Sequence, residues 1–420
     1  MGVRAGIVVT GTEVLTGRVT DRNGPWLAEQ LRQLGVDVGQ VIVVGDRPDD
    51  LRTALEFLIA VNDLVITSGG LGPTADDLTA AIVAQVQGRP SHLDRELEQR
   101  ITVIVEGLSR RFGGLRNPES TAIATRKQAM VPEGASVLEP AGTAPGLVVP
   151  VASDRTGPPV IVLPGPPWEL QQMWPAAVRS AQVQAVLAGV PELRQRTLRL
   201  WNVPESELAA TLRLLGDDLD GLEITTCQRG GELEIVSRYA PTAEPAQQRL
   251  VVAVRRDFPR QLFSEGPSVD ELVAAALKDR KWTMAVSEAA TGGTLAARLA
   301  NASLLGGLIV PTDVALTEVA RVPASLIETY GPVNPQIAQA MADGARAVFG
   351  ADVGLGVTAI GFNTENLGTV HLSVVTPEGV FDRALTVPGT VDTLRERVGP
   401  IALHVLRKAL AGGDLASRTP

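Results

Sequence analysis

The first part of the chain alternates short apolar runs with segments of helical periodicity, and this alternation restricts the fold more than any other feature. Apolar, β-branched runs at residues 6–9, 41–44 and 64–67 each precede an amphipathic segment. Parallel strands need crossover connections, and strands that helices cover on both faces are apolar throughout. The pattern therefore predicts an α/β fold with a parallel sheet. A further strand is expected at 161–163 and a helix at 167–184.

Helices are expected at 23–34, 49–60 and 76–112 of this first block. Asn23 is a candidate N-cap of the first helix, with Pro25 in its first turn, and Gly35 is expected to end it. The charged stretch 94–100 is expected on the outer side of the third helix.

Two further blocks follow. Residues 195–265 predict a small β-α-β-β-α module, with strands at 198–201, 222–226 and 232–236 and helices at 205–215 and 245–258. From residue 269 the α/β pattern returns, with strands expected at 283–286, 307–310, 354–357 and 369–375 and helices at 271–277, 293–300, 335–348 and 391–410. At ~150 residues per domain, a chain of 420 residues allows two or three domains. The pattern favours three, at 1–190, 195–265 and 269–415.

Composition excludes several classes of protein. The single cysteine, Cys227, excludes a disulfide scaffold and a cysteine-based zinc site, and it is typical of a reducing compartment. A net charge of −9 and 3% aromatic residues argue against nucleic-acid binding. No apolar run reaches the ~18 residues that a membrane span needs, and no signal peptide is evident. We expect a cytoplasmic protein that binds neither nucleic acid nor membrane.

Residues 67–79 read Thr-Ser-Gly-Gly-Leu-Gly-Pro-Thr-Ala-Asp-Asp-Leu-Thr and carry the most chemical information. The three glycines permit backbone conformations in which amide groups converge on an anion. Thr74 is expected to open a helix whose N-terminus also favours phosphate. Asp76 and Asp77 would repel a phosphate unless a divalent cation lay between them, so the loop predicts a metal-dependent phosphate site.

Part of this motif has a purely structural alternative. Thr74-x-x-Asp77 resembles a capping box, with aspartate in the place usually taken by glutamate or glutamine, so Asp77 is equally well interpreted as a cap. Asp76 has no such alternative.

Polar residues also follow the first two strands. Glu13 comes after the first strand and Asp46 after the second. Ligands of open α/β sheets bind beyond the carboxyl ends of the strands, so both are expected to approach Asp76. The alternatives are a turn or capping role for Asp46 and the N-cap role for Asn23.

Two other segments could contact a ligand. In Leu-Pro-Gly-Pro-Pro-Trp-Glu-Leu, residues 163–170, Gly165 would let the backbone approach a ligand, although a turn with proline at the start of a helix explains Pro166 equally well. Lys127 is one of four lysines and is interpreted either as a phosphate contact or as an ordinary surface lysine.

The chain from residue 3 to about 412 resembles the competence/damage-inducible protein family, CinA. The resemblance is carried by Gly-Thr-Glu-Val-Leu-Thr-Gly at 11–17, Asp21-x-Asn23, the 67–77 string, Arg-Lys-Gln-Ala at 126–129, Gly-Thr-Ala-Pro-Gly at 142–146 and the 163–170 string. It implies a molybdopterin-binding (MoaB/MogA-like) fold for the first domain and a homodimer of three-domain protomers. It also implies metal-dependent hydrolysis of ADP-ribose or related NAD-type nucleotides, which would give AMP and ribose 5-phosphate.

The candidate catalytic residues are therefore Asp46, Asp76, Asp77 and Glu13. The three aspartates are the candidate ligands of a divalent ion such as Mg, Mn or Co. The candidate substrate contacts are Gly69, Gly70, Leu71, Gly72, Thr74, Asn23, Lys127, Gly165 and Pro166.

The third block resembles the family's nicotinamide-nucleotide amidohydrolase domain without its catalytic residues. Active members typically read Ala-Glu-Ser-Cys-Thr-Gly-Gly, with the serine as nucleophile, whereas residues 287–293 read Ser-Glu-Ala-Ala-Thr-Gly-Gly and place Ala289 there. The tyrosine and lysine of a second motif are replaced by Pro311 and Leu316. A serine nucleophile needs a base to accept its proton. We therefore expect no deamidation of nicotinamide mononucleotide (NMN).

Two other functions remain open. The first is molybdopterin adenylyl transfer, although that family typically has Gly-Gly-Thr-Gly where this chain has Leu71 in third place. The second is nucleotide binding or sensing without turnover.

Overall fold

A computed structural model describes residues 2–112, 118–365 and 367–412. The chain divides into two compact units, one up to Glu192 and one from Leu193 onward. The expected end of the third block, 413–415, lies outside the described residues. The division into three parts stays a prediction, because the second unit holds both the middle module and the C-terminal part. No helix in the described part of the chain is long and apolar enough to cross a lipid bilayer.

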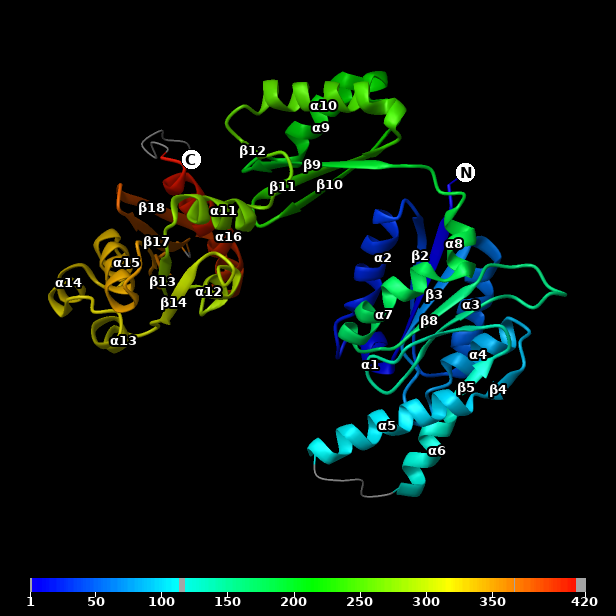
Figure 1. Cartoon of the computed structure of the whole chain (residues 1–420). Helices are drawn as coiled ribbons and strands as arrows, with labels where there is room; N and C mark the ends of the chain where they lie inside the picture. The colour runs from blue at the N-terminus through cyan, green and yellow to red at the C-terminus, as the bar shows by residue number, and fades with distance from the viewer. Residues whose placement is uncertain (1, 113–117, 366, 413–420) are drawn as a thin grey trace. The chain divides into compact units, whose positions relative to one another are not determined.

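The first unit is built on a six-stranded sheet in the order β2-β1-β3-β8-β7-β6 (Figure 1). The four strands from β2 to β8 run parallel, and β7 and β6 are antiparallel to their neighbours. This arrangement confirms the parallel sheet expected from the apolar runs. The strands are β1 Arg4–Thr10, β2 Asp37–Val44, β3 Leu64–Ser68, β6 Ser136–Leu138, β7 Gly146–Val149 and β8 Val160–Leu163.

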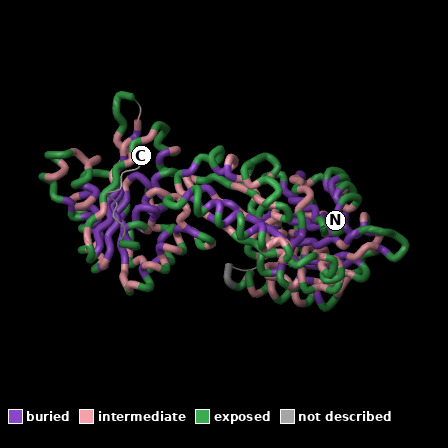
Figure 2. Tube along the Cα trace, turned by 90° about the horizontal axis from the view of Figure 1, so that it is seen from above, coloured by how far each residue is buried: buried purple, intermediate pink, exposed green. Residues whose placement is uncertain are grey.

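Helices cover both faces of this sheet, which explains why its strands are apolar throughout. One face packs against α2 (Asn23–Gln33) and α7 (Pro167–Arg179), and the other against α3 (Pro48–Val61) and α4 (Thr79–Val86). Figure 2 shows the buried residues of the chain enclosed by exposed ones. The short helices α1 (Thr12–Leu15) and α8 (Ala181–Leu187) complete this part.

The continuous helix expected over 76–112 is wrong. The segment contains α4, the strand β4 (Ser91–Leu93) and the helix α5 (Arg95–Phe112). Gly88, with φ of 69°, and Pro90, which lacks an amide proton, interrupt the helix. The strand β4 then pairs with β5 (Met130–Pro132), which follows the helix α6 (Pro118–Gln128).

The second unit begins with an antiparallel sheet in the order β10-β11-β9-β12. The strand β12 was not expected, and it extends the predicted β-α-β-β-α module to β-α-β-β-α-β. The module has a hydrophobic core of its own around Leu200, Leu233 and Leu250. Its elements are β9 Arg194–Trp201, α9 Glu205–Leu215, β10 Leu222–Arg229, β11 Glu232–Tyr239, α10 Glu244–Asp257 and β12 Leu262–Ser264, with 3-10 turns at Gly216–Leu219 and Pro241–Ala243.

The C-terminal part holds a sheet in the order β14-β13-β15-β17-β16, with β18 paired to β17. The helix α15 packs on one face, and α11 and α16 pack on the other. The strands are β13 Met284–Glu288, β14 Leu304–Ile309, β15 Val353–Val357, β16 Gly361–Phe362, β17 Leu367–Thr376 and β18 Gly379–Pro388. The helices are α11 Val269–Arg280, α12 Thr294–Arg298, α13 Asp313–Glu318, α14 Ala324–Tyr330, α15 Pro335–Phe349 and α16 Val391–Leu410.

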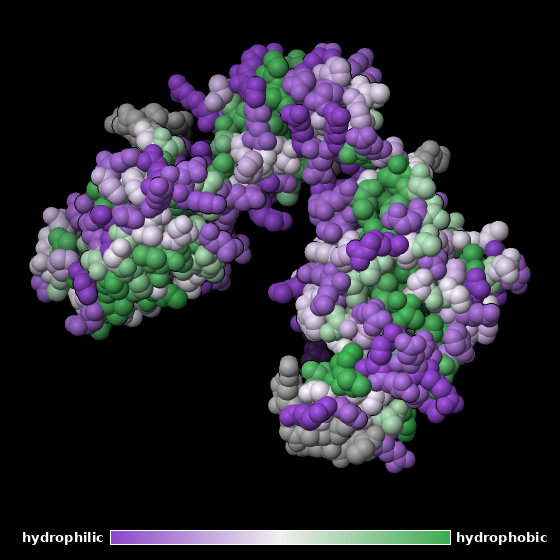
Figure 3. All heavy atoms as spheres, viewed as in Figure 1, coloured by the Kyte–Doolittle hydropathy of each residue, from purple (hydrophilic) through white to green (hydrophobic). Residues whose placement is uncertain are grey.

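One edge of this C-terminal sheet stays apolar at the surface. Leu305 and Ile309 of the edge strand β14 are 49% and 55% exposed, and Val314 of α13 is 70% exposed. Figure 3 shows hydrophobic residues gathered over this part of the unit.

Candidate functional site

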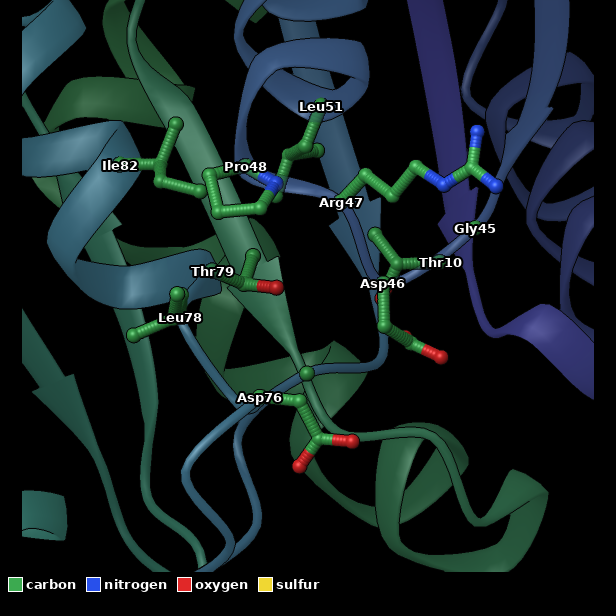
Figure 4. A pocket seen from close by; sticks show the side chains of 11 residues that line it. Thr10, Gly45, Asp46, Arg47, Pro48, Leu51, Asp76, Leu78, Thr79 and Ile82 are labelled. Carbon is green, nitrogen blue, oxygen red and sulfur yellow. The ribbon is translucent and has the colours of Figure 1, made fainter.

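A pocket of the first unit lies where β1, β2 and β3 end, at the edge of the sheet where an open α/β fold binds its ligand. Asp46, which follows β2, and Asp76, which precedes α4, both line it (Figure 4). The structure therefore brings together these two carboxylates, as expected from their places after strands. The remaining lining residues are Thr10, Gly45, Arg47, Pro48, Leu51, Gly70, Leu78, Thr79 and Ile82.

The glycines of the loop after β3 have different local roles. Gly69 and Gly70 have φ values of 105° and 67°, which only glycine adopts readily. A Cβ atom on Gly69 would lie 2.5 Å from the Thr10 carbonyl oxygen. Gly72 does not have a positive φ, but a Cβ atom there would lie 2.5 Å from the Asp77 carboxylate. The special backbone conformation expected for all three glycines is thus present at two of them.

The expected helix start at Thr74 is wrong, because α4 begins at Thr79. Residues between Gly70 and Thr79 form a loop that the Thr79 amide closes by donating to the Gly70 carbonyl, 3.1 Å away. The Asp77 carboxylate accepts hydrogen bonds from the Thr74 amide at 2.9 Å and from the Thr74 hydroxyl at 2.6 Å. Asp77 therefore closes a turn in the manner of a cap, although no helix starts there, and it is not among the pocket-lining residues.

Asp76 is exposed, and its surroundings lower the pKa of its carboxyl group. The Thr74 hydroxyl also lies within hydrogen-bonding distance of the Asp76 carboxylate, and this contact is the main cause of the lowered pKa of Asp76. The positive charge of Lys127 lowers the pKa of Asp76 further. Lys127 itself donates to the Thr74 carbonyl oxygen, so α6 supports the loop from outside.

Asp46 is anchored to the short helix after β1. Its carboxylate accepts a hydrogen bond from the Thr12 amide at 2.9 Å, and its own amide donates to the Thr12 hydroxyl at 3.2 Å. Figure 4 shows the carboxylates of Asp46 and Asp76 directed to the same side of the pocket and Arg47 directed away from them. Glu13 is exposed on α1 beside Gly11 and does not line this pocket.

The N-cap role considered for Asn23 is wrong. Asn23 is already inside α2, and the Asp21 carboxylate accepts the amide protons of Asn23 and Gly24 at 2.9 and 3.0 Å. The buried Asn23 side chain instead donates to the Ser68 hydroxyl at 2.8 Å and to the Gly165 carbonyl oxygen at 2.6 Å. It thereby fastens α2 to the end of β3 and to the turn after β8.

The other expected substrate contacts surround the same loop. The Leu71 side chain is buried in the core, and its carbonyl accepts a hydrogen bond from Gln128 at 3.0 Å. Gly165 and Pro166 are exposed, and a Cβ atom on Gly165 would lie 3.7 Å from the Cα of Gly69. The turn after β8 thus lies directly beside the glycine loop. Whether these residues contact a ligand stays a prediction.

The described residues of the pocket offer carboxylates but no complete set of protein ligands for a divalent cation. Among residues 2–112, 118–365 and 367–412, no group of three or more His, Cys, Asp and Glu side chains is placed to hold a metal ion. The expected trio of aspartates is therefore not assembled as a set of ligands. Mg²⁺, however, is usually held by one or two carboxylates together with substrate phosphates and water. Asp46 and Asp76 fit that smaller requirement.

The three altered positions of the C-terminal part follow two neighbouring strands: Ala289 comes after β13, and Pro311 and Leu316 come after β14. Ala289 follows β13, and its amide donates to the Val357 carbonyl at 3.0 Å. Leu316 of α13 is only 4% exposed and belongs to a hydrophobic cluster with Leu308 and Ile337. Pro311 is exposed. A position that holds lysine in the resembling family is thus part of an apolar core here.

Comparisons with known proteins agree with this architecture. Residues 6–184 match the family model described as a probable molybdopterin binding domain, and residues 267–410 match the CinA C-terminal domain. The chain is 49% identical to a CinA-like protein of Mycobacterium sp. (strain MCS), over 98% of this chain and 100% of that protein. It is 44% identical to a CinA-like protein of Mycobacterium tuberculosis (strain ATCC 25177 / H37Ra), over 98% of each.

Solved structures also resemble parts of the chain. A protein titled CinA, of unknown function, from Thermoplasma acidophilum matches with a TM-score of 0.35 and 31% identity, over 42% of this chain and 95% of that one. The molybdopterin biosynthesis enzyme MoaB from Thermus thermophilus matches with a TM-score of 0.29 and 19% identity, over 44% of this chain and 97% of that one.

The class of protein is thereby defined as a mixed α/β protein that joins a molybdopterin-binding-type domain to a CinA C-terminal domain. The near-complete coverage of its relatives shows that the chain belongs to the CinA family.

Proposed function

We propose that the first unit hydrolyses the pyrophosphate bond of ADP-ribose or of related NAD-type nucleotides, giving AMP and ribose 5-phosphate. The observation that carries the proposal is the pocket that combines the glycine loop at Gly69 and Gly70 with the carboxylates of Asp46 and Asp76. A loop of this kind suits an anion, and two carboxylates beside an anion need a cation between them.

The residues of the chain have separate roles in this proposal. Backbone amides at residues 70–72 bind phosphate oxygens and stabilise the negative charge that develops when water attacks phosphorus, whereas the Gly69 amide already donates to the Leu163 carbonyl at 3.0 Å. The bond between that phosphorus and the bridging oxygen then breaks, and the bridging oxygen leaves with the other phosphate. Asn23 keeps Gly165 and Ser68 in place beside the loop. Lys127 and Asp77 hold the loop's outer turn through Thr74.

Asp46 and Asp76 are the residues that would hold a divalent cation, with phosphate oxygens and water completing its shell. When bound, such a cation supplies charge neutralisation at the phosphates and lowers the pKa of a coordinated water. The contact with Thr74 lowers the pKa of Asp76, so its carboxylate stays ionised to more acidic pH than an ordinary aspartate does. Asp77 is the weaker ligand candidate, because its carboxylate already accepts two hydrogen bonds.

The experiment is to incubate the purified full chain with ADP-ribose and Mg²⁺, Mn²⁺ or Co²⁺, and to measure AMP and ribose 5-phosphate. Wild type should release both products in equal amounts. Asp76→Ala should lower kcat/KM by about 100-fold or more, because a preorganised electrostatic contact of this kind is worth about that much. Chelation of the metal should abolish turnover.

Asp50→Ala is the matched control, since Asp50 is an exposed aspartate in the first turn of α3 that does not line the pocket. It should retain wild-type turnover. Equal product release by wild type and Asp76→Ala would contradict the assignment of Asp76 as a ligand of the cation. Tight binding of ADP-ribose without any product would instead select the alternative of a nucleotide-binding protein without turnover.

A further inference from the structure

Thr10, the last residue of β1, is a pocket residue that the proposed function does not use. Its side chain is only 9% exposed, and its hydroxyl oxygen is buried with no hydrogen-bond partner among the residues that the structure describes. Thr10 lines the same pocket as Asp46, Gly70 and Asp76. A buried polar group without a partner calls for an explanation, such as a ligand or a water that is bound there.

The glycine loop, at Gly69 and Gly70, lies close to this hydroxyl group. The Thr10 oxygen lies 2.7 Å from the place that a Cβ atom on Gly69 would occupy and 3.2 Å from the corresponding place on Gly70. The two residues with positive φ therefore leave room for the hydroxyl group. Valine has the same shape and would fill this space without leaving a buried hydroxyl unpaired. Packing alone thus gives no reason for threonine at the end of β1.

The chemistry of the pocket favours a donor at this place. The carboxylates of Asp46 and Asp76 can only accept hydrogen bonds when ionised, and phosphate oxygens are acceptors as well. A threonine hydroxyl can donate. Figure 4 shows Thr10 beside Asp46, whereas the guanidinium group of Arg47 is directed away from the two carboxylates.

We propose that the Thr10 hydroxyl donates a hydrogen bond to a phosphate oxygen of the nucleotide that binds on the 69–72 loop. The inference rests on the proposed function and adds to it a side-chain contact to the pyrophosphate group. Thr10 is a binding residue in this scheme, because its hydroxyl touches the substrate and takes no part in proton transfer.

Thr67 offers a matched control. It is fully buried on β3, and its hydroxyl oxygen also lacks a hydrogen-bond partner within the described part of the chain. Thr67 pairs with Val8 of β1, two residues before Thr10, so both threonines lie on the same face of the sheet. Only Thr10 lines the pocket. Removal of either hydroxyl changes the core in the same way, but only one change alters the proposed binding site.

The experiment measures binding rather than turnover. Isothermal titration calorimetry of the full chain with inorganic pyrophosphate and Mg²⁺ is carried out for wild type, Thr10→Val, Thr10→Ser and Thr67→Val. Urea unfolding of each variant is measured alongside. Thr10→Val should weaken pyrophosphate binding by about tenfold or more, as expected for a hydrogen bond to a charged group. Thr10→Ser, which keeps the hydroxyl, should bind within about threefold of wild type, and Thr67→Val should bind as wild type does.

The outcomes separate this inference from the proposed function. If wild type and Thr10→Val bind pyrophosphate equally well, the Thr10 contact is wrong and the proposed function stands. If Thr10→Ser loses binding as Thr10→Val does, packing and not the hydroxyl is responsible, which also overturns the contact. If wild type neither binds pyrophosphate nor hydrolyses ADP-ribose, the proposed function fails and the Thr10 contact fails with it.

Discussion

Gly70 is the residue on which the shape of the 69–72 loop depends most directly. Its φ of 67° lies in the left-handed region, and a Cβ atom there would lie 2.1 Å from the hydroxyl oxygen of the buried Thr79. Gly17 has nearly the same backbone, with φ of 73°, but a Cβ atom there would meet no described atom within 4 Å. Comparing an alanine substitution at Gly70 with one at Gly17 therefore separates the free-energy cost of the backbone conformation from the cost of crowding.

Gly70→Ala is expected to destabilise the first unit by about 2–4 kcal/mol, because it combines backbone strain with a steric clash in a packed region. Gly17→Ala should cost about 1 kcal/mol, from the left-handed conformation alone. Urea unfolding of the full chain checks both values. Equal destabilisation by the two substitutions would show that Thr79 moves aside freely and that crowding does not shape the loop.

For single residues, the sequence predicts which side chains lie near the pocket better than it predicts their hydrogen-bond partners. The places of Asp46 and Asp76 after strands predict that they lie at one edge of the sheet, and both line one pocket. The role of Asn23 could not be predicted in the same way. Its partners Ser68 and Gly165 lie 45 and 142 residues away, and only the folded sheet brings them together. The capping role of Asp21, in contrast, is local and could be predicted from the sequence, since Asp21 lies two residues before Asn23.

Among the elements, those with strong periodicity were predicted best. The helices α9 and α16 have the bounds expected from the sequence, 205–215 and 391–410. The strand β18 was missed because it contains Asp382 and Arg383 and has no apolar run. It forms by pairing with β17, residue by residue, and that pairing is a tertiary contact. The break in 76–112 was marked by Gly88 and Pro90, whose effect outweighs the helical spacing around them.

A buried histidine of the helix α16 contacts the middle module. His404 is 2% exposed, and its Nε2 lies 2.9 Å from the Glu232 carboxylate of β11. The Trp201 ring of β9 stacks on the imidazole with 3.8 Å between ring centroids, and Phe263 of β12 meets it edge-on at 4.6 Å. Three strands of the module therefore contact a single side chain of α16.

This junction is expected to weaken in acid. Burial lowers the pKa of His404, and the hydrogen bond with Glu232 offsets this only in part. The unfolded chain therefore binds the proton first as the pH falls through about 6.5, the ordinary value for histidine. The stability that neutral His404 contributes is complete above that pH and is lost as the pH falls toward the folded pKa.

Urea unfolding of the full chain between pH 7.5 and pH 5 tests this expectation. The loss of stability over this range should be smaller in His404→Gln than in wild type. His92→Gln is the control, because His92 is exposed on β4 in the first unit, and it should lose as much stability as wild type. The same loss in His404→Gln and wild type would assign the acid sensitivity to other groups.

At the scale of the whole molecule, the two units differ in the side chains present at their candidate sites. The first unit keeps a pocket with two carboxylates and a glycine loop. The C-terminal part matches the CinA C-terminal domain but holds Ala289, Pro311 and Leu316 where the resemblance places a nucleophile and its helpers. Family membership follows from strings spread over the whole chain, whereas the homodimer implied by the resemblance stays a prediction.

The packing of Leu316 in the C-terminal part gives the last prediction. Leu316 is 4% exposed among Leu308, Ala320 and Ile337, so a lysine there would bury a charge in an apolar cluster. An uncompensated buried charge costs several kcal/mol. The full chain should therefore release no ammonia from NMN above background, and Ala289→Ser alone should not restore release, because no base is supplied. The triple variant with Pro311→Tyr and Leu316→Lys should lose about 3 kcal/mol or more in urea unfolding.

Ammonia release is measured against a catalytically active family member under the same conditions, so that a negative result reflects the protein and not the assay. Ala289→Val is the companion variant, since it fills the position without adding a nucleophile. Release by wild type that persists in Ala289→Val would locate a deamidase centre elsewhere in the chain. Release restored by Ala289→Ser alone would mean that a base other than the missing lysine serves the site. We expect neither outcome: Leu316 is 4% exposed in an apolar cluster, so the position where the resemblance implies a lysine offers no base to a serine at residue 289.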